Sequence, residues 1–186
     1  DFPALEWVVR LRNDGSADSP PVSGFKALDM VWRCARSGDL PELRRSLGSD
    51  GRHDDFQYQC RELRQSMWSK PCTVRMDTEQ NNAFRKVRNG SCLPCDGRPS
   101  ATWLPFFNLR TGEDGLILAV GWSGQWFAEF AHDGQGATRV TAGMEHLNSC
   151  LRPGETIRSP RLLVLYWQGD PIHGHNVLRR FLLAHH

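Results

Sequence analysis

Residues 115–143 read GLILAVGWSGQWFAEFAHDGQGATRVTAG, and the pattern of this stretch decides the fold. Its short apolar runs, separated by glycine-containing turns, predict consecutive antiparallel strands. The expected strands are Leu116 to Trp122, Gln125 to Ala131, and Ala137 to Gly143. Ser123-Gly124 predicts a two-residue hairpin loop, and residues 133–136 predict a second turn.

Such a hairpin places Trp126 opposite Gly121, where its ring would cover the bare glycine backbone. One face then carries Leu116, Leu118, Val120, Trp122, Phe127 and Glu129. The other face carries Ile117, Ala119, Trp126, Ala128 and Phe130. An antiparallel sheet with one solvated face should alternate between apolar and polar residues, and this one does not. We therefore expect a central hairpin that is covered on both sides, within a layered β-structure.

The composition is that of an ordinary globular domain. Of the 186 residues, 24% are charged and 39% are hydrophobic, and the formal net charge is only +2. This charge gives no electrostatic reason to expect a nucleic acid or an anionic membrane as partner. No apolar run is long enough to predict a membrane span. The seven Trp and nine Phe suit a β-sheet core better than a set of carbohydrate-stacking platforms.

The chain begins Asp1-Phe2-Pro3, with neither an initiator Met nor the basic region of a signal peptide. We expect this start to be a processed end or a point inside a longer polypeptide. The sequence does not decide between the cytoplasm and secretion.

The six cysteines are too sparse for a disulfide-stapled small protein. They are Cys34, Cys60, Cys72, Cys92, Cys95 and Cys150. Cys92-Leu-Pro-Cys95 is a lone CxxC in a loop-like context, which fits neither a zinc knuckle nor a strand-to-helix redox motif. Structural cysteines, free or locally paired, are favoured over metal or redox chemistry, and no cofactor is expected.

Further strands are expected on both sides of the central stretch. Their ranges are Phe2 to Arg12, Val22 to Trp32, Ala101 to Leu109, and Arg161 to Gln168. Gly38 to Ser46 could be a strand or a helix, but Pro41 and the turn-like residues 48–51 favour a short edge strand. Residues 52–99 predict an irregular, loop-rich insertion with short strands. Residues 152–155 carry Pro and Gly at the positions that a type II turn requires.

The residues after 169 change from a strand period to a helix period. Asp170 can cap a helix, and Pro171 suits its first position. Leu178, Phe181, Leu182 and His185 fall on one helix face. We expect a β-sandwich domain over 1–169, followed by a helix over 170–186 that stops at a domain boundary.

Catalytic motifs are weak. Gly121 to Gln125 misses the spacing of a nucleophile elbow, and no P-loop, dinucleotide fingerprint or HExxH occurs. His173 and His175 are two positions apart, which favours surface or helix-start histidines over metal ligands.

Carboxylates are the remaining enzymatic option. Asp54 and Asp55 are adjacent, so on extended chain they point in opposite directions and cannot form a facing acid/nucleophile pair. A solvated turn is the favoured interpretation. Asp133 lies in a predicted turn, and Glu129 is expected to bond to an arginine of a neighbouring strand. No catalytic residue and no metal ligand is assigned.

Several segments together resemble a known family. They are FPALEW (2–7), LPFFNL (104–109), GWSGQW (121–126), AGME (142–145), LRPGE (151–155), SPR (159–161) and NVLRRF (176–181). In this order they resemble the N-terminal β-sandwich domain of α-galactosidases in glycoside hydrolase family 36. The likeness is best over 101–186, fair over 1–56 and weak in between.

The resemblance implies an all-β fold: a large antiparallel β-sandwich of the galactose-mutarotase-like, super-sandwich type, with a connector helix leading to a (β/α)₈ barrel. In that family the nucleophile and the acid/base lie on the barrel, so no residue here inherits either role. Such a domain packs on the barrel and, in some oligomeric members, contributes a loop to the rim of a sugar site. Asp54, Asp55 and Phe56 are the rim candidates, because loops carry function and paired acceptors suit sugar hydroxyls.

Three functions therefore remain open. The first is a non-catalytic domain of an α-galactosidase-like enzyme, whose expected partners are its own barrel, an α-galactoside or another glycan and, in a homo-oligomer, a further copy of the same chain. The second is a free-standing carbohydrate-binding module, and the third is a small enzyme using local carboxylates. Trp122 and Trp126 are candidate stacking residues, but the expected strand pairing assigns them to the core.

Overall fold

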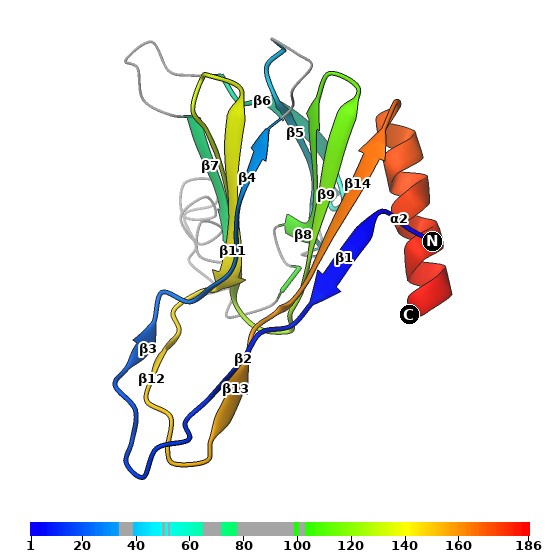
Figure 1. The fold of residues 1–186 in the computed structure, drawn as a ribbon. Helices are drawn as coiled ribbons and strands as arrows, with labels where there is room; N and C mark the ends of the chain where they lie inside the picture. Colours follow the sequence, from blue (N-terminus) through cyan, green and yellow to red (C-terminus); the bar gives the residue numbers. More distant parts are fainter. Residues whose placement is uncertain (34–38, 50, 52, 65–71, 78–98, 101–102) are drawn as a thin grey trace.

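The computed structural model describes residues 1–33, 39–49, 51, 53–64, 72–77, 99–100 and 103–186. Two antiparallel sheets face each other, and a helix lies on the outer side of one of them (Figure 1). This is the all-β sandwich with a C-terminal helix that the sequence predicts. The predicted cysteine loop at 92–95 lies outside the described residues.

The larger sheet has six strands in the order β1-β14-β9-β8-β5-β6. Their bounds are β1 Ala4–Trp7, β14 Arg161–Gln168, β9 Asp114–Gly121, β8 Trp103–Thr111, β5 Glu42–Leu47 and β6 Tyr58–Glu62. Every neighbouring pair is antiparallel. The predicted edge strand around Gly38 to Ser46 is wrong in its position, because β5 lies between β8 and β6 and has a partner on each side.

The smaller sheet has four strands in the order β4-β11-β10-β7. Their bounds are β4 Lys26–Arg33, β11 Ala137–Met144, β10 Trp126–His132 and β7 Cys72–Asp77. β10 and β11 form the predicted hairpin, in which Phe127 pairs with Gly143 and residues 133–136 turn.

Two short ribbons extend away from the sandwich (Figure 1). One pairs β2 (Arg10–Arg12) with β13 (Thr156–Arg158), and the other pairs β3 (Val22–Ser23) with β12 (Asn148–Ser149). The single strands expected over 2–12 and 22–32 are therefore each divided between a sheet and a ribbon. Gly24, with φ +62°, separates β3 from β4. The type II turn at 152–155 is confirmed, since Gly154 has φ +77° and the Glu155 amide donates to the Arg152 carbonyl.

The predicted hairpin between the first two central strands is wrong. β9 pairs with β8 and β14, whereas β10 pairs with β11 and β7, so Ser123-Gly124 connects the two sheets instead of closing a hairpin. Trp126 consequently does not cover Gly121, whose nearest neighbour is the Arg161 side chain. The predicted division into two faces is wrong for the same reason.

The main core fills the space between the sheets. Leu116, Leu118 and Val120 of β9 share it with Trp126 and other side chains of the opposite sheet. Phe107 contacts Trp126 and Phe130 across the interface in edge-to-face geometry, with ring centroids 5.7 Å apart in both pairs. Trp126 is 1% exposed, as the assignment to the core predicts, and Trp122 packs half-buried against the same core.

A second core lies on the outer face of the six-stranded sheet. There Ile117, Ala119, Leu163, Leu165 and Trp167 meet Val177 and Phe181 of α2 (Pro171–His185). The predicted cap is confirmed, because the Asp170 carboxylate accepts from the Ile172 amide at 2.7 Å and Pro171 opens the helix. β9 is thus covered on both faces, as its lack of polar residues predicts. Within the described residues, no helix is long and apolar enough to cross a membrane.

Candidate functional site

The loop that joins β5 to β6 holds the predicted rim residues. The Asp55 carboxylate accepts from the Ser49 hydroxyl at 2.8 Å and from the Gly51 amide at 2.9 Å, and it thereby closes the loop on itself. The Asp54 carbonyl accepts from the Gln57 amide. The Asp55 carboxylate therefore helps to organise its own loop.

Phe56 lies near the end of this loop, where its amide donates to the Gly48 carbonyl, and it has an unusual backbone conformation. Its φ of +62° lies in the left-handed region, which a bulky residue adopts only when its surroundings hold it there. Its side chain is nevertheless 58% exposed. The loop thus presents a large aromatic ring to solvent beside a carboxylate cluster, which is a combination that sugar hydroxyls and a sugar face can contact.

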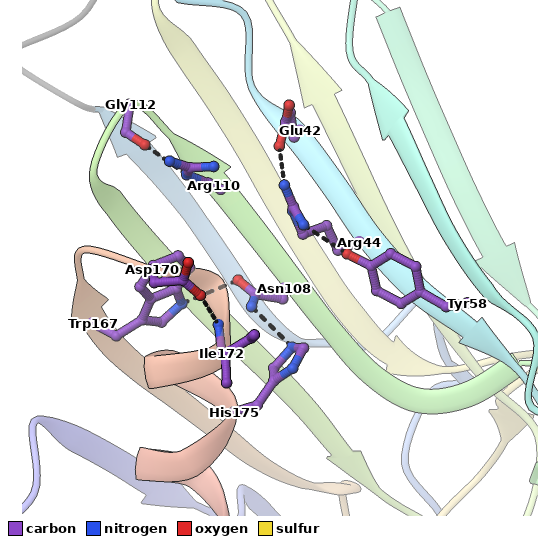
Figure 2. A network of polar contacts seen from close by, with 10 residues as sticks. All are labelled: Glu42, Arg44, Tyr58, Asn108, Arg110, Gly112, Trp167, Asp170, Ile172 and His175. Carbon is purple, nitrogen blue, oxygen red and sulfur yellow. Dashed lines mark hydrogen bonds and ion pairs between the residues drawn. The ribbon is translucent and has the colours of Figure 1, made fainter.

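Next to the loop, polar side chains cover the outer faces of β5 and β6. Arg44 donates to the Glu42 carboxylate at 2.6 Å and to the Tyr58 hydroxyl at 2.8 Å (Figure 2). Burial lowers the pKa of Arg44, but these two hydrogen bonds, together with the charges of Tyr58 and Cys60, outweigh burial and raise it overall. Arg44 is therefore a fixed cation whose charge is balanced by Glu42.

A groove of about 90 Å³ lies between this polar region and α2. Its walls are Arg44, Arg45, Ser46, Tyr58, Leu104, Phe106, Phe107, Asn108, Ile117, His175 and Leu178. Tyr58 and Phe106 are 49% and 40% exposed. The groove therefore combines half-exposed aromatic rings with the polar groups of Arg44, Asn108 and His175.

Asn108 forms the polar centre beneath α2 (Figure 2). Its side chain is 3% exposed; its Oδ1 accepts from the Trp167 indole N–H at 3.0 Å, and its Nδ2 lies 3.1 Å from His175 Nε2. Burial, followed by the charge of Arg44, lowers the pKa of His175. We refer to Trp167, Asn108 and His175 together as the Asn108 bridge.

Trp167 is held between two glycines. It is paired with Gly115 across the β9–β14 ladder, and a Cβ on Gly115 would overlap the indole. On the other side, a Cβ on Gly174 of α2 would lie 2.7 Å from the same ring system. The sequence predicts that Trp126 covers a glycine of the neighbouring strand. In the structure, Trp167 covers a strand glycine, Gly115, instead.

Other titratable groups make contacts within the strands and turns of the sandwich. Asp133 accepts from the amides of Gln135 and Ala137 in the β10–β11 hairpin, and these bonds lower its pKa. Burial and the charge of Arg61 lower the pKa of Arg45 to about 10, and its guanidinium lies 4.2 Å from the Trp103 ring centroid. The hydrogen bond to Asp29 and the charge of Asp29 raise the pKa of Arg139, and the negative charge of Glu129 on the neighbouring strand adds a smaller contribution.

The histidines and cysteines give no metal centre in the described part of the chain. His173 and His175 both lie on α2, as expected, but only His175 takes part in the Asn108 bridge. Cys60 and Cys150 are free and exposed. Burial raises the pKa of the Cys60 thiol, which favours its neutral, less nucleophilic form.

The β5–β6 loop is visible in the sequence, but the groove is not. A lone amide in the apolar run around Asn108 is the signal that could have drawn attention to it, since buried amides need partners. Its partners His175 and Trp167 lie 67 and 59 positions away, so nothing local indicates them.

Comparison with known proteins shows the fold. No family model and no curated protein matches the sequence. Solved structures do match: GH36 α-galactosidase AgaA from Geobacillus stearothermophilus is 16% identical with a TM-score of 0.61, over 91% of this chain and 21% of that one. The galactosidase domain of α-galactosidase-sucrose kinase AgaSK is 15% identical with a TM-score of 0.61, over 90% and 20%. An α-galactosidase from Lactobacillus brevis is 14% identical with a TM-score of 0.58, over 90% and 20%. This chain therefore spans about a fifth of the length of the α-galactosidases that it resembles.

Proposed function

We propose that this chain is the non-catalytic β-sandwich domain of an α-galactosidase-like glycoside hydrolase, which packs against a catalytic (β/α)₈ barrel of the same polypeptide. The proposal rests on the difference between the fraction of this chain that matches and the fraction of each matched enzyme that is covered. The similarity extends over about 90% of this chain but only about 20% of each α-galactosidase. One domain of such an enzyme accounts for both fractions.

The carboxylates of Asp55, Asp133 and Glu129 support this assignment, because their contacts and positions do not suit glycoside hydrolysis. Glycoside hydrolysis requires two carboxyl groups that face each other across the scissile bond, about 5–10 Å apart. Asp55 closes its own loop and Asp133 caps a hairpin. Glu129 lies on a different sheet from the β5–β6 loop. These groups do not converge on a shared substrate position.

We further propose that the β5–β6 loop shapes the rim of the sugar site, with Asp54, Asp55 and Phe56 as the contact residues. The ordered carboxylate and the exposed ring of Phe56 support this role. A strained backbone at an exposed aromatic residue is a common mark of a binding loop. Among the matched structures, one AgaA variant is a complex with raffinose and another a complex with stachyose.

Hydrolysis of an aryl α-galactoside tests the main proposal. The 186-residue chain should be inactive, and the polypeptide that contains it together with a barrel bearing paired aspartates should be active. Turnover by the isolated chain would contradict the proposal. So would a gene that encodes this domain without any barrel.

The rim is tested separately in the barrel-containing enzyme. Asp54→Asn combined with Phe56→Ala should raise KM for α-galactosides while leaving kcat nearly unchanged, because these residues contact substrate outside the reacting bond. Val31→Ala is the matched control, since Val31 is 53% exposed on the four-stranded sheet. Identical kinetics for the rim variant and the control would remove the rim role and leave the main proposal intact.

A free-standing carbohydrate-binding module is the second candidate. The observation in its favour is the groove beside α2, with two half-exposed aromatic rings next to polar groups. Glycan-array binding by the isolated chain, lost on Tyr58→Ala, would favour this function. Absence of binding at millimolar sugar would favour the enzyme domain.

A further inference from the structure

We propose that the Asn108 bridge is a pH-sensitive latch, which holds α2 on the six-stranded sheet while His175 is neutral and weakens that attachment when His175 is protonated. The inference is independent of the proposed function, because it depends only on contacts within this chain. It concerns the helix that covers β9 and β14.

The direction of the hydrogen bonds follows from their chemistry. An indole N–H can only donate, so Oδ1 of Asn108 accepts from Trp167, as the geometry shows. The amide nitrogen therefore faces His175, and an amide nitrogen can only donate. Nε2 of His175 must then accept, which requires a neutral ring that carries its proton on Nδ1.

When His175 is protonated, no orientation of the Asn108 amide satisfies both of its hydrogen bonds. With Nε2 protonated, two donors face each other across 3.1 Å. Rotating the Asn108 amide would give the histidine an acceptor, but it would turn the amide nitrogen toward the Trp167 donor. One direct hydrogen bond of the bridge is therefore lost in either orientation, although Asn108 and Trp167 are only 3% and 2% exposed.

The surroundings of His175 also oppose its positive charge. Among the described residues that line the groove, the charged or titratable neighbours are Arg44 and Arg45 of β5 and Tyr58 of β6. β8, β9 and β14 contribute uncharged groups, namely Asn108, Ile117 and Trp167. Glu42 is engaged by Arg44, and Asp170 caps the helix. Burial and Arg44 lower the pKa of His175 from 6.5, in agreement with the hydrogen-bond argument.

The ring is also accessible. The outer part of His175 is exposed while Nε2 faces the buried amide, so a proton can reach it without opening the sandwich core. Because its pKa is lowered on folding, its contribution to stability is complete above the unfolded value of 6.5 and is lost as the pH falls through the folded pKa. Acid should therefore release α2 before it unfolds the sheets.

The decisive measurement is a ¹⁵N NMR titration of the histidines in the 186-residue chain. Near neutral pH, His175 should show the Nδ1–H tautomer, which is the minor form of free imidazole, and it should titrate below 6.5. The Nε2–H tautomer, or a His175 pKa at or above 6.5, would overturn the proposal. This measurement requires no variant to fold.

Hydrogen exchange then tests the release of the helix. Between about pH 7.5 and pH 5, the amides of α2 should lose protection after correction for intrinsic exchange. The loss should be about tenfold for each pH unit by which the pKa of His175 in the folded chain lies below its pKa when α2 is detached from the sheet. The amides of β10 and β11 should keep theirs. Equal loss in both regions would contradict a latch that acts on α2.

Two variants complete the test. His175→Gln keeps an acceptor for Asn108 but does not titrate, so its α2 protection should not fall with acid. His173→Gln removes an exposed histidine of the same helix and should keep the wild-type response. If His175→Gln retains the acid sensitivity, or His173→Gln abolishes it, the latch is not at His175.

Discussion

The outer faces of the two sheets differ in kind. On the six-stranded sheet, Leu163, Leu165 and Trp167 are at most 3% exposed, because α2 lies on them. On the four-stranded sheet, Arg139 donates through Nε and Nη2 to both carboxylate oxygens of Asp29, at 2.7 and 2.6 Å, in contact with solvent. In Figure 1 the helix lies beside β14, on the side of the sandwich away from β4 and β11.

The comparison teaches that stability is concentrated on the covered face. An apolar outer face gains free energy only when a second layer removes it from water, at about 25 cal/mol per Å². A charged outer face gains little, because exposed ion pairs are screened and entropically costly. Substitutions on the two faces should therefore differ sharply in effect.

The largest expected effect is that of Trp167→Ala. It removes a buried indole, exposes Gly115 and leaves the Asn108 amide without a donor, so the free energy of unfolding should fall by about 3–5 kcal/mol. Chemical denaturation followed by circular dichroism measures this fall. Val31→Ala on the solvated face should change it by less than about 0.5 kcal/mol. Similar losses for the two variants would show that α2 contributes little.

Gly174→Ala should have the next largest effect. Alanine favours a helix by about 1 kcal/mol over glycine, but its Cβ would meet an indole that Gly115 prevents from moving away, and overpacking costs about 1–3 kcal/mol. We expect a net loss of up to about 2 kcal/mol. Asn176→Ala, on the exposed side of α2, should instead give a gain below about 1 kcal/mol. A stabilising Gly174→Ala would show that Trp167 is not confined.

A smaller effect is expected at the β10–β11 hairpin. Asp133→Ala removes the acceptor of two backbone amides, but the carboxylate is exposed, so the loss should stay below about 1 kcal/mol. Because the folded pKa of Asp133 is lowered, its contribution is present above the ordinary value of 3.8 and is lost as the pH falls through the folded value.

Asp133→Asn provides the control for this prediction. Its amide oxygen still accepts both bonds, so the stability near neutral pH should be close to that of the wild type, while the acid dependence due to this group should disappear. An unchanged acid profile in Asp133→Asn would assign that dependence to other carboxylates.

The smallest effect should come from the Asp29–Arg139 pair. Replacing both residues by alanine should leave the unfolding midpoint nearly unchanged, and adding salt should remove any residual difference. A double-mutant cycle at low and high salt measures the coupling. A large coupling that survives high salt would contradict the contrast between the two faces.

Much of the fold could be predicted from the sequence, because its signals are local. The apolar run of β9 indicates a strand covered on both faces, and Asp170-Pro171 indicates the start of a helix. The prediction of a hairpin at Ser123-Gly124 was wrong, because the same dipeptide can either close a hairpin or connect two different sheets. That choice depends on packing such as Phe107 against Trp126, which no local pattern contains.

The candidate site was less predictable. The β5–β6 loop is visible in the sequence because polar residues and glycine break the strand pattern around Asp54-Asp55. The groove and the Asn108 bridge are not visible, because β5, β8, β14 and α2 are brought together only by the order of strands in the sheet.

The sequence by itself determined the long strands of the central stretch, which strand must be buried on both faces, and where the helix begins, because these follow from residue period, turn chemistry and capping over a few neighbouring positions. Only the tertiary structure decided which strands pair, that the sheets divide at Ser123-Gly124, and that Trp167, Asn108 and His175 meet. The physical reason is that pairing and side-chain complementarity are fixed by contacts between residues far apart in the chain, whose free energies exist only once both sheets and the helix are in place.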